Sequence, residues 1–101
     1  MDLSREELLR SLGALEPLLR GEGVTRLALF GSRARQDHRP DSDVDVAIDV
    51  ASNTKFSLID LVGVAQQIED RTGLQANVFM RRSLDAPFIR ELERDAIEVF
   101  G

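Results

Sequence analysis

The most constraining feature of this chain is an alternating segment at residues 43–50, Asp-Val-Asp-Val-Ala-Ile-Asp-Val. Successive side chains of a β-strand point to opposite faces of a sheet. The β-branched residues at the even positions of this segment therefore share one face, which we expect to be buried. The acids Asp43, Asp45 and Asp49 share the other face. Aspartate is a poor strand former, so this row of acids lowers strand propensity without an evident structural return.

Turn signals and apolar periodicity around this strand predict a small α/β (α+β) fold. Ser4 and Glu7 form a typical capping box, and leucines follow at helical spacing, with Pro17 expected to kink or shorten that helix near Glu16. The other expected elements are a strand at 24–30, a helical turn at 32–36, a loop at 37–42, a helix from residue 58 ended by Gly73, a strand at 74–80, a short helix with Pro87 in its first turn, and an edge strand at 97–100. We expect the helices to pack on one face of a small mixed β-sheet, and the acid-bearing face to line an open cleft.

Composition narrows the classes of protein that this chain can represent. Its 101 residues fit one domain, 1–101, and the balance of 43% hydrophobic and 31% charged residues is globular. A net charge of −5 argues against a protein that grips an extended nucleic acid. No apolar run is long enough to span a membrane. The absence of cysteine excludes thiol chemistry and suits a cytoplasmic location.

Gly31 and Ser32 follow the first expected strand directly. Glycine lets the backbone approach a ligand closely, and free amides at a helix start, together with the Ser32 hydroxyl, suit a phosphate group. An ordinary turn is the alternative interpretation of this dipeptide.

Asp43 and Asp45 project from the same strand face, about 6.5–7 Å apart along the backbone. Such a pair can converge on one or two Mg²⁺ ions, which prefer hard oxygen ligands. A solvated polar strand face is the alternative. The glycine turn ends one strand and the acid pair begins the next, so a triphosphate could bridge them.

The segments 29–35 (Leu-Phe-Gly-Ser-Arg-Ala-Arg) and 42–49 (Ser-Asp-Val-Asp-Val-Ala-Ile-Asp) resemble the signature of the MNT-type minimal nucleotidyltransferases of the DNA polymerase beta superfamily. The similarity reaches the closing segment 97–100 and so covers nearly the whole chain. The resemblance implies transfer of a nucleoside monophosphate, with AMP from ATP as the expected case, to a hydroxyl group. It further implies an antitoxin-like role towards a HEPN-domain protein partner.

The same resemblance assigns roles to individual residues. Asp43 and Asp45 would hold Mg²⁺, as two ions in the family pattern, and would carry catalysis. Gly31, Ser32 and Ser42 would contact the nucleotide. Arg35 would brace the loop or meet phosphate, with a salt bridge to a nearby acid as the alternative.

Asn77 departs from the family pattern, which places a third carboxylate on the next strand. Strand alternation puts Asn77 on the acid-bearing face, yet an amide carries no charge and cannot accept a proton as a base. A non-catalytic module that binds nucleotide and neutralises its partner by complex formation is therefore the second hypothesis. A homodimer is compatible with either one, because a small sheet with exposed edges often pairs.

The remaining polar residues are interpreted as structural or solvent-exposed. We expect Asp49 to be a charge at the rim, Arg33 to be solvated, and His38 to be a surface loop residue. The pair Arg81-Arg82 is expected to form a solvated turn rather than a patch that binds nucleic acid.

Overall fold

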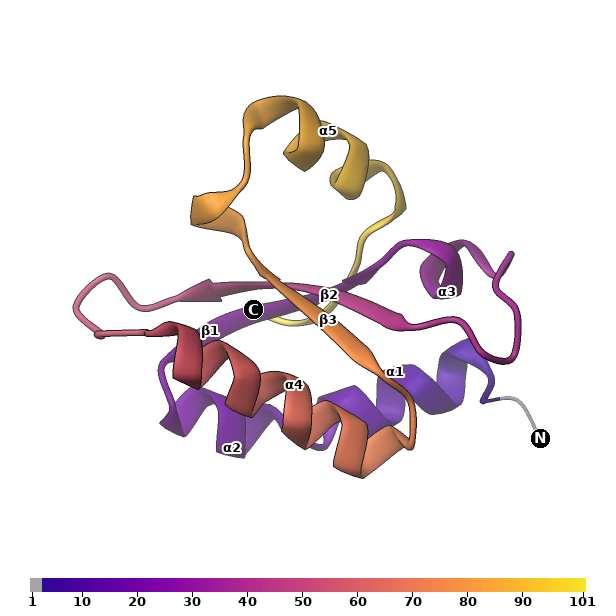
Figure 1. Cartoon of the computed structure of the whole chain (residues 1–101), viewed down its shortest axis with the longest axis horizontal. Coiled ribbons are helices and arrows are strands. Elements are labelled where there is room, and N and C mark those ends of the chain that lie inside the picture. The colour runs from indigo at the N-terminus through magenta and orange to yellow at the C-terminus, as the bar shows by residue number, and fades with distance from the viewer. Residues whose placement is uncertain (1–2) are drawn as a thin grey trace.

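The computed structural model describes residues 3–101 as four strands and several helices around one sheet (Figure 1). The elements in chain order are α1 (Arg5–Gly13), α2 (Glu16–Gly21), β1 (Val24–Phe30), α3 (Ser32–Arg35), β2 (Val44–Val50), α4 (Leu58–Thr72), β3 (Ala76–Met80), the 3₁₀ turn η1 (Arg81–Ser83), α5 (Ala86–Asp95) and β4 (Ile97–Phe100). The strands lie in the order β3-β2-β1-β4. Only β2 and β3 are parallel, so the predicted mixed sheet is confirmed.

Local signals in the sequence set the ends of the helices. The Ser4 hydroxyl accepts a hydrogen bond from the Glu7 amide, and the Glu7 carboxylate accepts one from the Ser4 amide, as a capping box requires. The expected helix is divided in two and not merely kinked. Helix α1 ends at Gly13, and Pro17 lies in the first turn of a separate helix, α2. Proline is tolerated there because first-turn amides have no partner within the helix. Gly73 ends α4 in the left-handed conformation, with a φ of 74°.

Helices α1, α2 and α4 cover one face of the sheet, as predicted (Figure 1). The even-numbered residues of β2 pack there against fully buried leucines of the N-terminal helices and against Val64 and Ile68 of α4. This layer is the main core, and hydrophobic burial within it holds the strands in register. Among residues 3–101, no helix combines the length and apolar character needed to cross a membrane.

Helix α5 is the exception to the expected one-sided packing, because it lies across the opposite, acid-bearing face (Figure 1). Leu92 of α5 packs on Phe30 and Ala47, and the partly buried Phe79 joins this second cluster. The acid-bearing face is therefore charged towards both ends of β2, at the acid pair and again at Asp49, and apolar between them. That apolar part requires a cover, and α5 supplies it.

Candidate active site

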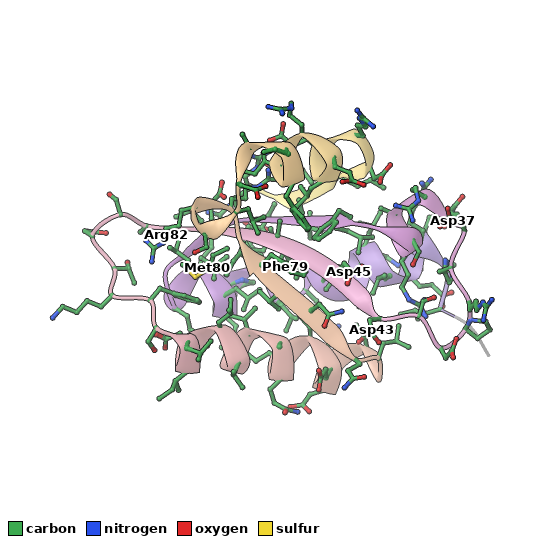
Figure 2. The ribbon with its side chains drawn as sticks, turned by 45° about the horizontal axis from the view of Figure 1, so that its top comes forward. Asp37, Asp43, Asp45, Phe79, Met80 and Arg82 are labelled. Carbon is green, nitrogen blue, oxygen red and sulfur yellow. The ribbon has the colours of Figure 1, made fainter. Side chains whose placement is uncertain are left out.

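The centre of the candidate site is the acid pair Asp43 and Asp45, both labelled in Figure 2. Asn77 of the neighbouring strand holds the two carboxylates together. Asn77 is the register partner of Asp45 in the parallel β2–β3 ladder. Its side-chain nitrogen donates to Asp43 Oδ2 at 3.1 Å and to Asp45 Oδ1 at 3.0 Å. The two carboxylates therefore point to one place, as strand alternation predicted.

Gly31 lies against this acid pair. Its φ of 77° and ψ of −157° fall in a region that other residues rarely adopt. A Cβ atom at this position would lie only 2.6 Å from Asp45 Oδ2. The register explains the proximity, because Phe30, the residue before Gly31, pairs with Asp45 across the β1–β2 ladder. The predicted proximity of the glycine turn and the acid pair is confirmed.

A pocket of about 340 Å³ opens beside these residues. Its lining comes from the end of β1, from α3, from β2 and from α5: Phe30, Gly31, Ser32, Arg35, Asp45, Phe88, Glu91, Leu92 and Asp95. The rings of Phe30, Phe79 and Phe88 pack together, with centroids 5.6–6.3 Å apart, and form the apolar side of this region. Glu91 and Asp95 were not expected at the site, since they lie about half the chain away in sequence and no local motif marks them.

Arg35 lines the pocket and also takes part in the salt bridges that were the alternative interpretation. Its guanidinium contacts Asp37 at 3.0 Å and Asp95 at 2.9 Å. Hydrogen bonds to Asp37 and then to Asp95 raise the pKa of Arg35 above its usual value. The side chain is 45% exposed, so these bonds link α5 to the loop after α3 without removing the guanidinium from solvent.

The expectation that Arg33 is a solvated charge is wrong, because only 1% of this residue is exposed. Its guanidinium donates to the carbonyl oxygens of Ser42 at 3.0 Å and of Pro40 at 3.1 Å. Loop carbonyls beneath the surface need donors, and arginine offers five in a fixed geometry. Ser42 itself accepts a hydrogen bond from the Arg39 amide through its hydroxyl. These contacts set the loop that leads into Asp43.

Arg81 is likewise buried, contrary to the expected solvated turn, whereas Arg82 is exposed. Arg81 lies 3.5 Å from Asp49 and 3.1 Å from Glu93 of α5, so it joins β2 to α5. Asp49 also lies 3.8 Å from Arg26. Asp49 is thus paired with two arginines, and it lies at the opposite end of β2 from the acid pair. His38 is half-buried in the loop between α3 and β2.

The donor set of the acid pair fits a divalent cation of the magnesium type. Two carboxylates face one place, Asp45 also lines the pocket, and a turned Asn77 side chain would offer its carbonyl oxygen to the same ion. Within residues 3–101, no cluster of three or more acidic or histidine side chains is arranged for a metal. The third position of the site is thus an amide rather than a carboxylate.

Comparison with known proteins agrees with the fold. The family described as nucleotidyltransferase domain matches residues 6–99. The protein adenylyltransferase MntA of Thermococcus cleftensis is 30% identical over 98 residues, which cover 96% of this chain and 97% of that relative. A solved structure of a candidate minimal nucleotidyltransferase is 29% identical, with a TM-score of 0.79 and coverage of 96% and 95% of the two chains.

A more distant structural neighbour is a chain of a toxin-antitoxin complex. That structure holds a tri-AMPylated HEPN toxin of Shewanella oneidensis with an MNT antitoxin. The match is 18% identical, has a TM-score of 0.69, and covers 93% of this chain and 72% of that chain, so it shows a shared fold. Fold and site together define a nucleotidyl-transferring class of enzyme. The chain belongs to the nucleotidyltransferase domain family, in its minimal form.

Proposed function

We propose that this protein is a Mg²⁺-dependent adenylyltransferase that moves AMP from ATP to a hydroxyl group of a HEPN-type toxin partner, and so acts as an antitoxin. The observation that carries the proposal is the contact between the acid pair and Gly31 at the mouth of the pocket. An enzyme that transfers a nucleotidyl group needs metal ligands next to a phosphate-binding turn. The relative from Thermococcus cleftensis, which carries the name protein adenylyltransferase, supports a protein as the acceptor.

Each residue of the site has a chemical role in this proposal. Asp43 and Asp45 would hold Mg²⁺, which would offset the charge of the triphosphate and favour the deprotonated acceptor. The amides of Gly31 and Ser32 receive the β- and γ-phosphates, and Arg35 meets phosphate from the pocket wall. Ser42 fixes the loop that presents the acid pair to the nucleotide.

The transfer is a substitution at the α-phosphorus. The acceptor oxygen forms a bond to that phosphorus while the bond to the oxygen bridging the α- and β-phosphates breaks. Pyrophosphate leaves with the electron pair, and the proton of the hydroxyl group passes to a carboxylate oxygen of the acid pair. Asn77 cannot take this proton, because its side chain is a neutral amide that already donates to both acids.

That same amide favours a second candidate function. With Asn77 in place of a third acid, the protein could bind nucleotide and its partner without efficient transfer. Neutralisation of the partner would then come from complex formation alone. The two functions differ in whether the partner gains covalent AMP.

The experiment mixes the purified protein with ATP, Mg²⁺ and a HEPN-domain protein from the same genome, and follows the partner's intact mass. Adenylylation adds one or more AMP masses. Asp43→Asn and Asp45→Asn keep the side-chain size but remove the charge, so we expect at least a 100-fold loss of transfer. Asp49→Asn is the matched control on the same strand face and is expected to stay within twofold of wild type. No added mass in wild type, with transfer gained in Asn77→Asp, would support the binding module.

A further inference from the structure

Strand β3 has a free edge beside the acid pair. It is the outermost strand of the sheet, and Figure 1 shows it (orange) in front of β2 with no other strand beyond it. The Val44 amide donates to the Gln75 carbonyl at 2.8 Å, which fixes the pattern of the parallel ladder. In that pattern alternate residues of β3 face β2, so the peptide groups of Ala76, Val78 and Met80 point away from the sheet. The Ala76 amide confirms this direction, because it donates to Glu69 of α4 at 3.1 Å.

Beyond Ala76 the edge lacks the usual protection of exposed strands. Proteins commonly blunt such edges with charged residues, prolines or bulges. The β3 sequence Ala-Asn-Val-Phe-Met contains neither charge nor proline, and its pairing with β2 runs without a register shift. Glu69 covers the first outward peptide group, and the outward groups of Val78 and Met80 remain available for another strand.

An apolar groove follows this edge. It has a volume of about 250 Å³ and lies between α4 and β3, where Leu61, Val62 and Ala65 face Ala76 and Val78. Val62 is 61% exposed, and Leu58 and Ile59 extend the apolar surface at 76% and 83% exposure. Exposed apolar clusters of this kind commonly mark contacts with another polypeptide.

The groove is continuous with the candidate active site. Asn77 lines the groove and also donates to both Asp43 and Asp45. The nucleotide-sized pocket lies on the opposite side of Asp45, at the end of β1. A ligand in the groove and a nucleotide in the pocket would therefore reach the acid pair from opposite sides, as a substitution at phosphorus requires.

We propose that the acceptor segment of the partner protein binds as an extended strand on the free edge of β3. Alternate side chains of such a strand point to opposite faces. One set enters the groove against Val62, and the other lies on the face of Asn77 and Phe79, from which a hydroxyl group approaches the acid pair. The segment therefore carries its acceptor hydroxyl residue between two apolar residues. A second copy of this chain on the same edge would instead cover the approach to Asn77.

This inference rests on the proposed transfer to a protein, and the test separates the two. The binding partner is the HEPN-domain protein used above. Val78→Pro removes one outward amide and leaves the bonds to β2, while Val62→Asp places a charge in the groove. Both variants are expected to weaken the complex and to slow transfer at least tenfold, with ATP affinity within twofold of wild type. Leu18→Asp, at a 54% exposed site on α2, is the control and is expected to change neither.

Hydrogen exchange of the wild-type complex provides a readout that does not depend on variants. The amides of Val78 and Met80 should exchange at least tenfold more slowly with the partner bound. A complex without this protection, normal binding by Val62→Asp, or no complex at all would overturn the docking mode. A wild-type homodimer that Val62→Asp converts to monomer would show that a second copy of this chain binds the β3 edge, and would also overturn the docking mode. Loss of the complex in Val62→Asp, with no AMP transfer by wild type, would retain the docking mode and refute the enzyme.

Discussion

Asn77 and Asp45 face each other across the parallel β2–β3 ladder, with the Asn77 amide nitrogen 3.0 Å from Asp45 Oδ1. The same nitrogen also reaches Asp43. Two like charges that face one place repel, and a neutral donor between them lowers that repulsion. Asn77 therefore stabilises the acid pair when no metal is bound, and a carboxylate at this position could not do so.

This relationship predicts opposite effects of Asn77→Asp on stability and on metal binding. Without metal, the third carboxylate removes two charge-assisted hydrogen bonds and adds repulsion, so we expect a loss of about 1–3 kcal/mol in the free energy of unfolding. With Mg²⁺ present, the variant should recover most of that loss, because it offers one more anionic ligand. Urea unfolding with and without Mg²⁺ measures both. Asn77→Ala is the control, since it should lose stability without gaining any response to the ion.

Gly31→Ala should disrupt the site through geometry alone. The new Cβ would meet Asp45 at 2.6 Å, and the backbone would keep a positive φ. We expect a cost of about 1–3 kcal/mol in stability and at least a tenfold loss of ATP affinity. Gly63→Ala is the matched control, because nothing lies within 4 Å of its Cβ position in α4. That control should gain up to about 1 kcal/mol from helix propensity. Equal effects at both positions would contradict a special role for Gly31.

The part of the site that could be predicted from the sequence depends on local patterns, namely side-chain alternation along a strand and a short connecting loop. Alternation along 43–50 placed Asp43 and Asp45 on one face, and the short loop before them brought Gly31 close. Asn77 was also expected on that face, and the ladder aligns it with Asp45. In each case the relevant residues belong to neighbouring strands, and the two-residue period of a strand fixes the face of the sheet to which each side chain points.

The parts that sequence reasoning missed depend on where a distant element packs. A short helix with Pro87 in its first turn was expected, yet nothing local indicated that α5 would cross to the acid-bearing face. The burial of Arg33 and Arg81 was missed for the same reason. Each arginine is buried because carbonyls or acids from other segments surround it, and a charged residue gives no sign of such partners in its own sequence neighbourhood.

Arg33→Ala should destabilise the protein more than any exposed arginine substitution. It would leave the partly buried carbonyl oxygens of Pro40 and Ser42 without their donor. We expect a loss of about 2–4 kcal/mol in the free energy of unfolding, from unsatisfied polar groups and lost packing. Faster proteolysis of the loop at 37–42 should accompany it. The exposed Arg82→Ala is the control, expected within about 0.5 kcal/mol of wild type. A loop that resists protease as well as wild type would contradict the anchoring role.

Arg35→Met separates the two functions considered for this side chain. Its salt bridges with Asp37 and Asp95 are exposed, so their loss should change stability little. If the guanidinium also meets phosphate, the variant should raise the KM for ATP about tenfold. Asp95→Asn is the informative partner variant, because it breaks the bond to α5 yet leaves the guanidinium in the pocket wall. We expect that variant to keep the KM within twofold. A KM that rises equally in both variants would mean that Arg35 acts by bracing α5 and not by contact with the nucleotide.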